Sequence, residues 1–132
     1  MTDNSNGRTG NSASVLIVED SEPQALKLKL ALEHNGCNVL WSENGLGGLD
    51  LTQENEFDLI ILDVELPDIN GFEVCRRLKS DPTLKDIPVV MLTTLDGAND
   101  VMSGLDAGAI DYIPKDAFAE VVLIETIKQL KS

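Results

Sequence analysis

The chain has 132 residues, 42% of them hydrophobic, which is enough for one domain with a core. No run approaches the roughly 18 apolar residues of a membrane span, and residues 1–13 lack the apolar segment of a signal peptide. The net charge of −13 argues against direct binding of nucleic acid by this domain. We therefore expect a cytoplasmic protein, in which Cys37 and Cys75 are unpaired thiols.

The first residues differ in composition from the rest of the chain. Residues 1–13 are rich in Asn, Ser, Gly and Thr and show no apolar periodicity, so we expect a disordered tail there. Residues 14–132 contain no linker or low-complexity stretch. We expect them to form one domain.

In the first half of this domain, short apolar runs alternate with amphipathic segments. A strand is predicted at 15–18, followed by a helix with Pro23 in its first turn and a C-cap signal at 34–36. A second strand is predicted at 37–41, and a second helix, weakened by three glycines, at 44–54. The apolar face of the first helix is assigned to Ala25, Leu26, Leu28, Leu30 and Leu32.

The second half continues the alternation. The uninterrupted apolar run at 59–62 is typical of a strand covered on both faces, and Asn70 can cap the helix that follows it. A fourth strand is predicted at 88–92, a weak helix at 99–106 and a short strand at 112–113. A closing helix is predicted at 118–130, with an apolar face of Val121, Val122, Ile124, Ile127 and Leu130.

Five strands that alternate with five helices predict a parallel sheet with helices on both faces. In such sheets, ligands bind beyond the carboxyl ends of the strands. Polar groups stand at four of these predicted ends: Glu19 and Asp20, then Asp63, then Thr93 and Thr94, and finally Lys115.

These residue types indicate phosphoryl chemistry that depends on a metal. Three carboxylates in one crevice repel one another, and a hard divalent cation such as Mg²⁺ relieves that repulsion. An ionised Asp63 can then act as a nucleophile toward phosphorus. Lys115 and Thr93 can bind the oxygens of the transferred group.

Four segments of the chain resemble the response-regulator receiver family of two-component signalling. They are VLIVED, DLIILDVELPDINGFEVCRRLK, IPVVMLTTL and GLDAGAIDYIPKDAF, and the resemblance covers roughly Ser14 to Leu130. Each motif is weak alone, but their order at successive strand ends is highly specific. The resemblance implies a flavodoxin-like, doubly wound (βα)5 fold, with a five-stranded parallel sheet in the order 2-1-3-4-5.

The resemblance also implies a role for each residue at the strand ends. Asp63 would be phosphorylated by a histidine kinase, a phosphotransfer protein or a small phosphodonor. Mg²⁺ would be held by Glu19, Asp20, Asp63 and the backbone carbonyl of Glu65. The groups implied in phosphate binding and switching are Thr93, Thr94, Lys115, Tyr112 and the backbone N–H of Val64.

The implied response is a change of surface rather than catalysis on a separate substrate. Thr93 would move toward the phosphate and Tyr112 would turn inward, which would remodel the face formed by the last two helices and the fifth strand. That face would control a downstream protein or output domain, and it is the one that dimers in this family often use. Catalysis would be confined to the domain's own phosphorylation and dephosphorylation.

Asp116 departs from the family pattern, in which proline follows the lysine after a cis peptide bond. We predict a trans Lys115–Asp116 bond and a rearranged loop, because a cis bond before a non-proline residue costs about 2.5–4 kcal/mol.

The sequence disfavours three alternatives to a phosphorylated receiver. A degenerate receiver that binds partners without phosphorylation typically lacks an acid or the lysine, and this chain keeps them all. A phosphatase of the haloacid-dehalogenase type needs a DxDx[TV] motif, which the sequence from Asp63 to Leu66 does not supply. A flavodoxin needs a phosphate-binding loop where Glu19 and Asp20 stand.

Overall fold

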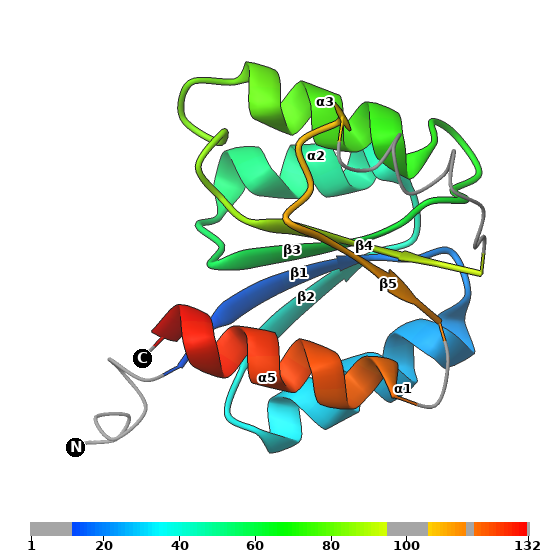
Figure 1. The fold of residues 1–132 in the computed structure, drawn as a ribbon. Helices are drawn as coiled ribbons and strands as arrows, with labels where there is room; N and C mark the ends of the chain where they lie inside the picture. Colours follow the sequence, from blue (N-terminus) through cyan, green and yellow to red (C-terminus); the bar gives the residue numbers. More distant parts are fainter. Residues whose placement is uncertain (1–11, 95–105, 116–117, 132) are drawn as a thin grey trace.

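A parallel sheet runs through the middle of the molecule, between two layers of helices (Figure 1). The computed structural model describes residues 12–94, 106–115 and 118–131. Neighbouring strands are all parallel, in the order β2-β1-β3-β4-β5, so the predicted doubly wound fold is confirmed. The strands are β1 (Ser14–Val18), β2 (Asn38–Ser42), β3 (Leu59–Asp63), β4 (Val89–Thr93) and β5 (Asp111–Pro114).

Helices cover both faces of the sheet. α1 (Glu22–His34) and α5 (Ala119–Lys131) lie on one face, and α2 (Gly45–Glu54) and α3 (Gly71–Ser80) lie on the other (Figure 1). None of these helices, within the part of the chain that the structure describes, has the length and apolarity needed to cross a bilayer. The weak helix predicted at 99–106 falls outside the described residues except for its last position, and so does the Lys115–Asp116 bond.

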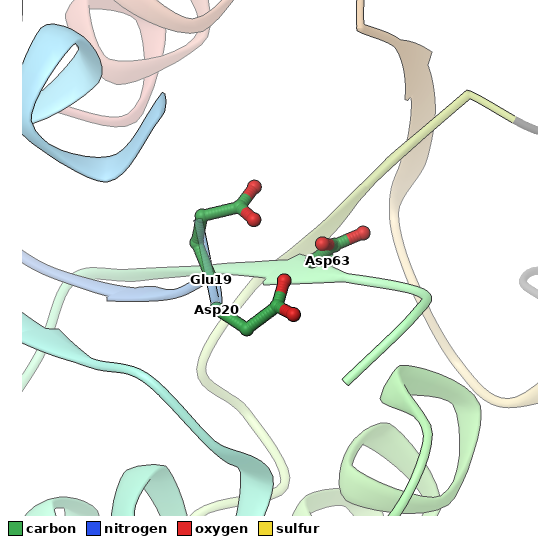
Figure 2. A group of neighbouring side chains, drawn as sticks. All are labelled: Glu19, Asp20 and Asp63. Carbon is green, nitrogen blue, oxygen red and sulfur yellow. The ribbon is translucent and has the colours of Figure 1, made fainter. Parts of the chain in front are cut away.

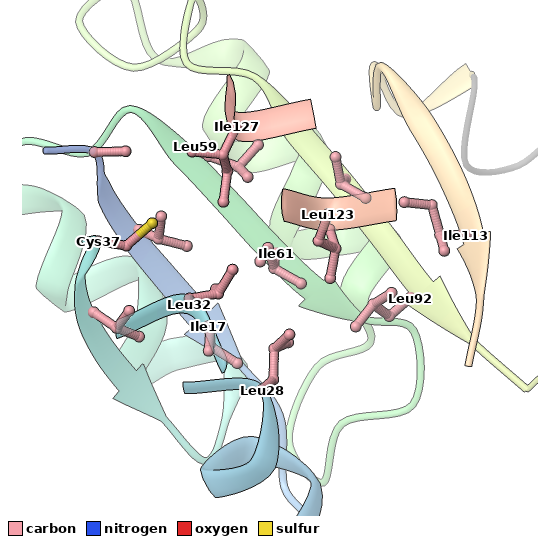
Figure 3. Close-up of a cluster of buried hydrophobic side chains, with 14 residues drawn as sticks. Ile17, Leu28, Leu32, Cys37, Leu59, Ile61, Leu92, Ile113, Leu123 and Ile127 are labelled. Atoms are coloured by element: carbon pink, nitrogen blue, oxygen red, sulfur yellow. The ribbon is translucent and has the colours of Figure 1, made fainter. Parts of the chain in front are cut away.

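The strands alternate their side chains between two hydrophobic clusters. Ile17 and Ile61 point toward α1 and α5, into the cluster drawn in Figure 3. Leu16 and Ile60, one residue earlier on the same strands, point toward α2 and α3. Because both faces are covered, β1, β3 and β4 read as continuous apolar runs.

The buried stripe of α1 is narrower than predicted. Ala25, Leu28 and Leu32 are buried, whereas Leu26 is exposed and Leu30 is 64% exposed. The buried positions are three and four residues apart, as the helical period of 3.6 residues requires for one face. Assigning every leucine of this helix to the core was therefore wrong.

The buried face of α5 was also predicted incorrectly in part. Leu123 and Ile127 are its buried residues and Ile124 is partly buried, but the assigned face included three exposed positions. A helix rich in β-branched residues on several sides carries no single apolar stripe in its sequence, so the sequence left its rotation undetermined. The exposed residues are Val121, Val122 and Leu130.

Ala13, the residue before the predicted domain boundary, packs with the described domain. Ala13 is buried, and its carbonyl oxygen accepts a hydrogen bond of 2.8 Å from the N–H of Asn38. Residues 1–11 lie outside the described residues. Cys37 and Cys75 are unpaired and buried, as predicted, and burial raises the pKa of both thiols.

Candidate functional site

Polar side chains meet at the carboxyl ends of the strands because the sheet is parallel and in register. Asp63 is the last residue of β3 and lies beside Leu92 of β4. Thr93 ends β4 and lies beside Pro114 of β5, directly before Lys115. This edge of the sheet therefore collects side chains from distant parts of the sequence.

Three carboxylates form a cluster that could hold a cation. Glu19 and Asp20 are the two residues that follow β1, and Asp63 is the last residue of the neighbouring β3 (Figure 2). Each residue offers an oxygen atom within 4.8 Å of those offered by the other two. Glu19 and Asp63 are buried, and Asp20 is exposed. An all-oxygen set with one exposed member suits a hard divalent cation that keeps part of its hydration.

Lys115 supplies positive charge to the same cluster. Its Nζ atom lies 2.8 Å from Oε1 of Glu19 and 2.9 Å from Oδ2 of Asp63, and it donates a hydrogen bond of 3.0 Å to Oε1 of Gln24. Burial lowers the pKa of Lys115, but its hydrogen bonds and charge interactions with Glu19 and Asp63 outweigh burial and raise the pKa overall. The side chain is therefore an ammonium, and its three N–H donors all have acceptors.

Main-chain groups fix the position of Asp63. Oδ1 of Asp63 accepts a hydrogen bond of 3.2 Å from the N–H of Glu65. The N–H of Val64 instead donates to the carbonyl oxygen of Leu92, at 3.1 Å, and extends the pairing of β3 with β4. The N–H of Glu65 was not among the predicted groups, and a contact of the Val64 N–H with a phosphoryl oxygen stays a prediction.

Gly71, the first residue of α3, packs against the main chain of Asp63. Its N–H donates to the carbonyl oxygen of Val64 at 2.8 Å. A Cβ atom at this position would overlap the carbonyl oxygen of Asp63 and would lie 3.0 Å from the methyl group of Met91. Only glycine lets α3 begin this close to β3.

Glu19 is held by β2 and by its own loop. Its carbonyl oxygen accepts a hydrogen bond of 2.7 Å from Nε1 of Trp41, and its N–H donates to the carbonyl oxygen of Ser42 at 3.0 Å. Its Oε2 atom accepts from the N–H of Ser21 at 3.0 Å. The bond from Ser21 orients the carboxylate, and the other two hold the main chain of Glu19 beside β2.

Asp68 ties the loop between β3 and α3 to α2. Its two carboxylate oxygens accept hydrogen bonds of 2.8 Å each from the N–H groups of Gly45 and Leu46. Desolvation raises the pKa of Asp68, but the hydrogen bonds from Leu46 and Gly45 outweigh it and lower the pKa overall. Asn44 caps the same helix through the N–H of Gly47, at 2.6 Å. A glycine-rich helix with no acid in its first turn thus has its N-terminal N–H groups satisfied.

The predicted switch residues lie at the same edge or on β5. Thr93 is buried at the end of β4, and its carbonyl oxygen accepts the N–H of Lys115 at 2.8 Å. Thr94 is exposed. Tyr112 is partly buried on β5 and packs against the hydrophobic cluster on the side of α2 and α3. The structure thus brings Glu19, Asp20, Asp63 and Lys115 into one cluster, and the switching roles stay predictions.

Comparison with known proteins indicates the family to which a chain with this fold and carboxylate cluster belongs. The family model for the response regulator receiver domain matches residues 15–128. The chain belongs to the response regulator receiver family. Receiver domains of this family are the signalling modules of two-component systems, so the family prediction is confirmed.

Two curated relatives of this receiver domain are about twice as long as the segment that it matches. The response regulator MprA of Mycobacterium sp. (strain KMS) is 39% identical to this chain over 109 aligned residues. The alignment covers 83% of this chain and 46% of MprA. The chain is 44% identical over 109 residues to the uncharacterized transcriptional regulatory protein YkoG of Bacillus subtilis (strain 168), covering 83% and 47%. The chain thus spans about half the length of these relatives.

Solved structures share the fold of this receiver domain. A receiver domain of a histidine kinase from Syntrophus aciditrophicus is 40% identical, with a TM-score of 0.83 over 90% of this chain and 89% of that one. The Mn²⁺-bound form of the response regulator Rcp1 is 27% identical, with a TM-score of 0.75 over 91% and 92%. The BeF₃-activated receiver domain of DrrB is 31% identical, with a TM-score of 0.78 over 90% and 97%.

Two residues at the site were not predicted from sequence, Gln24 and Trp41. Gln24 lies in the first turn of α1, four residues after Asp20, and that spacing was the only signal for it. Trp41 lies one residue before the end of β2, where an aromatic side chain indicates packing more often than a hydrogen bond to a neighbouring segment.

Proposed function

We propose that this receiver domain accepts a phosphoryl group on Asp63 from a histidine kinase or phosphotransfer protein, in a reaction that requires Mg²⁺. The observation that carries the proposal is a buried carboxylate at a strand end, in contact with an ammonium and beside two further carboxylates. A solvated aspartate at a turn would need none of these neighbours.

Asp63 is suited to act as the nucleophile. Its Oδ2 atom lies 2.9 Å from Nζ of Lys115, and the N–H of Glu65 donates a hydrogen bond to its Oδ1 atom. In the transfer, a carboxylate oxygen forms a bond to phosphorus while the bond from phosphorus to the donor's histidine nitrogen breaks, and the nitrogen keeps the electron pair. Asp63→Asn would remove the charge that makes the oxygen nucleophilic.

The carboxylate cluster would hold the cation. Glu19, Asp20, Asp63 and the backbone carbonyl of Glu65 would supply oxygen ligands, and the Mn²⁺-bound form of the similar Rcp1 supports a divalent ion at such a site. When bound, Mg²⁺ supplies positive charge against the transferred phosphoryl group. Lys115 contacts carboxylate oxygens of the same two residues, Glu19 and Asp63, so their use as metal ligands would leave the ammonium available to a phosphoryl oxygen.

The output would follow from the groups that bind the phosphoryl oxygens. Thr93 is the proposed hydroxyl donor, and the N–H groups of Thr94 and Val64 are further proposed donors. Movement of Thr93 would let Tyr112 turn inward and change the face formed by β5, α5 and the preceding segment. That face would bind a downstream protein or output domain, or a second receiver in a homodimer.

We further propose the boundaries of the domain and the compartment in which it acts. Residues 14–132 would be the receiver domain, extended by the buried Ala13, and the residues before Ala13 would be a disordered tail. The domain would act in the cytoplasm, because two free buried cysteines fit a reducing compartment. It would turn over no substrate besides its own phosphoryl group, and its net charge of −13 disfavours direct contact with nucleic acid.

Intact mass spectrometry tests the acceptor and the metal together. Wild-type protein incubated with acetyl phosphate and Mg²⁺ is expected to gain the mass of one phosphoryl group, and to gain none when EDTA is present. Asp63→Asn should gain none under either condition, whereas Asp86→Asn, a change at an exposed acid after α3, should behave as the wild type. A wild type without a metal-dependent adduct would refute the function, and an adduct in Asp63→Asn would refute the assignment of the residue.

A further inference from the structure

Lys115 has one neutral hydrogen-bond acceptor at the site. Among the described residues, its Nζ atom has three acceptors: Oε1 of Glu19 at 2.8 Å, Oδ2 of Asp63 at 2.9 Å and Oε1 of Gln24 at 3.0 Å. Gln24 stands 91 residues away in the sequence, in the first turn of α1. Its acceptor is an amide oxygen, so it bonds the ammonium without contributing charge.

The other two acceptors, Glu19 and Asp63, would have other partners during phosphorylation. On the proposed function, on which this inference rests, Glu19 and Asp63 ligate the metal and Asp63 carries the phosphoryl group. Lys115 then has to leave at least one of these oxygens. Gln24 is neither a metal ligand nor a phosphoryl acceptor, so its bond to Lys115 can persist through the change.

We propose that Gln24 is a positioning residue, which holds the ammonium of Lys115 at the phosphoryl site while the metal and the phosphoryl group engage its carboxylate partners. Gln24 does not touch the reacting atoms itself. It acts through Lys115, the residue to which the proposed function assigns a phosphoryl oxygen.

The surroundings of Lys115 explain why it needs such a residue. An open cavity of about 270 Å³ lies beside the ammonium, and its lining includes Gln24, Leu28, Leu92, Lys115 and Glu120. This volume has room for several water molecules at about 30 Å³ each. Glu120, on α5, offers a competing carboxylate, which pairs with Lys27 at 3.6 Å. Without Gln24, the long lysine side chain is free to turn into this cavity and away from Asp63.

The helix that carries Gln24 is well anchored. The N–H of Ala25 donates to the carbonyl oxygen of Ser21 at 2.9 Å, and Ala25 and Leu28 are buried against the sheet. Ser21 itself bonds Oε2 of Glu19 through its N–H. Hydrogen bonds thus connect the first turn of α1 to the carboxylate cluster, and the Gln24 side chain, although exposed, extends from a hydrogen-bonded helical turn.

The test compares Gln24→Met with the wild type, because methionine has the length of glutamine and lacks its acceptor. Affinity for beryllofluoride is measured at saturating Mg²⁺, and affinity for Mg²⁺ is measured separately without beryllofluoride. We expect Gln24→Met to bind beryllofluoride three- to tenfold more weakly, or about 0.7–1.4 kcal/mol, and to bind Mg²⁺ with no loss of affinity. Gln53→Met, the same change at an exposed position of α2, should match the wild type in both measurements.

The outcomes separate this inference from the proposed function. If the wild type binds beryllofluoride and Gln24→Met binds it equally well, Gln24 does not position Lys115 and the inference is overturned. If Gln24→Met loses affinity for Mg²⁺ and beryllofluoride alike, Gln24 supports the metal site as a whole, which also overturns the inference. A wild type that fails to bind beryllofluoride with Mg²⁺ overturns the proposed function, and the inference with it.

Discussion

The indole N–H of Trp41 donates a hydrogen bond of 2.7 Å to the main-chain carbonyl oxygen of Glu19. Trp41 is the single tryptophan of the chain, so its fluorescence reports on one end of the carboxylate cluster. We expect Mg²⁺ to change this fluorescence in a saturable way, and Asp20→Asn to weaken the apparent affinity about tenfold or more by removing a charged ligand.

A matched control for this titration is Asp50→Asn, at an exposed acid on α2. It changes the net charge by the same amount without touching the cluster, so its affinity for Mg²⁺ should equal that of the wild type. Equal affinities of Asp20→Asn and Asp50→Asn would contradict the assignment of Asp20 as a ligand.

Replacing Lys115 tests its part in the metal-free fold. Lys115→Met leaves the buried carboxylates of Glu19 and Asp63 without their positive partner, which should lower the free energy of unfolding by about 3 kcal/mol in EDTA. Mg²⁺ should stabilise the variant more than the wild type, because the ion no longer competes with the ammonium. Urea unfolding with and without Mg²⁺ measures both effects.

The corresponding control is Lys29→Met, which breaks the exposed pair with Glu33 on α1. That change should cost about 0.5 kcal/mol or less, with no dependence on Mg²⁺. If Mg²⁺ raises the free energy of unfolding equally in the wild type and in Lys115→Met, lysine and metal do not compete.

Asp68 should make stability depend on pH. Because its pKa is lowered, its contribution is complete above the unfolded pKa of about 3.9 and is lost as the pH falls through the folded pKa. Asp68→Ala should therefore lower the free energy of unfolding by about 1 kcal/mol at pH 7, and the difference from the wild type should shrink as the pH falls through the lowered pKa of the folded state. A difference that stays constant with pH would show that the carboxylate charge has no part in capping α2.

Gly71→Ala should affect both stability and the site. The added Cβ meets main-chain atoms of Asp63, which cannot move without shifting the acceptor, so we expect a loss of about 2–3 kcal/mol and slower phosphorylation. Chemical unfolding and the rate of adduct formation measure the two effects.

Gly36→Ala is the matched comparison for Gly71→Ala. Nothing lies within 4 Å of a Cβ at Gly36, but its φ of +89° makes alanine cost about 1–2 kcal/mol. Phosphorylation of this variant should proceed at the wild-type rate. Equal rates in the two variants would mean that Gly71 matters for folding alone.

The sequence predicted the strands and the gathering of Asp63 and Lys115 at one edge because both follow from strong local patterns. Continuous apolar runs mark β3 and β4, and in a parallel sheet the residues after such runs necessarily share an edge. The strand boundaries shifted by about one residue, as at β2, where pairing with β1 sets the limits.

The rotation of α1 and the contact of Gln24 with Lys115 could not be predicted in this way. Leu26 and Leu30 are exposed although leucine favours the core, because the placement of the helix on the sheet decides which leucines are covered. The bond between Gln24 and Lys115 joins side chains 91 residues apart and leaves no periodic trace. Contacts of this kind depend on side-chain geometry after folding.

Among the described strands, β5 lies at the edge of the sheet and pairs with β4 alone, and Lys115 follows it directly. During translation, the acids Glu19, Asp20 and Asp63 are synthesised before Lys115, their positive partner. A nascent or partly folded chain without a docked β5 holds three acids with no ammonium among them. On the proposed function, the site gains its ammonium, and with it the means to hold a phosphoryl group, only when β5 docks, so an unfinished chain would carry no signal.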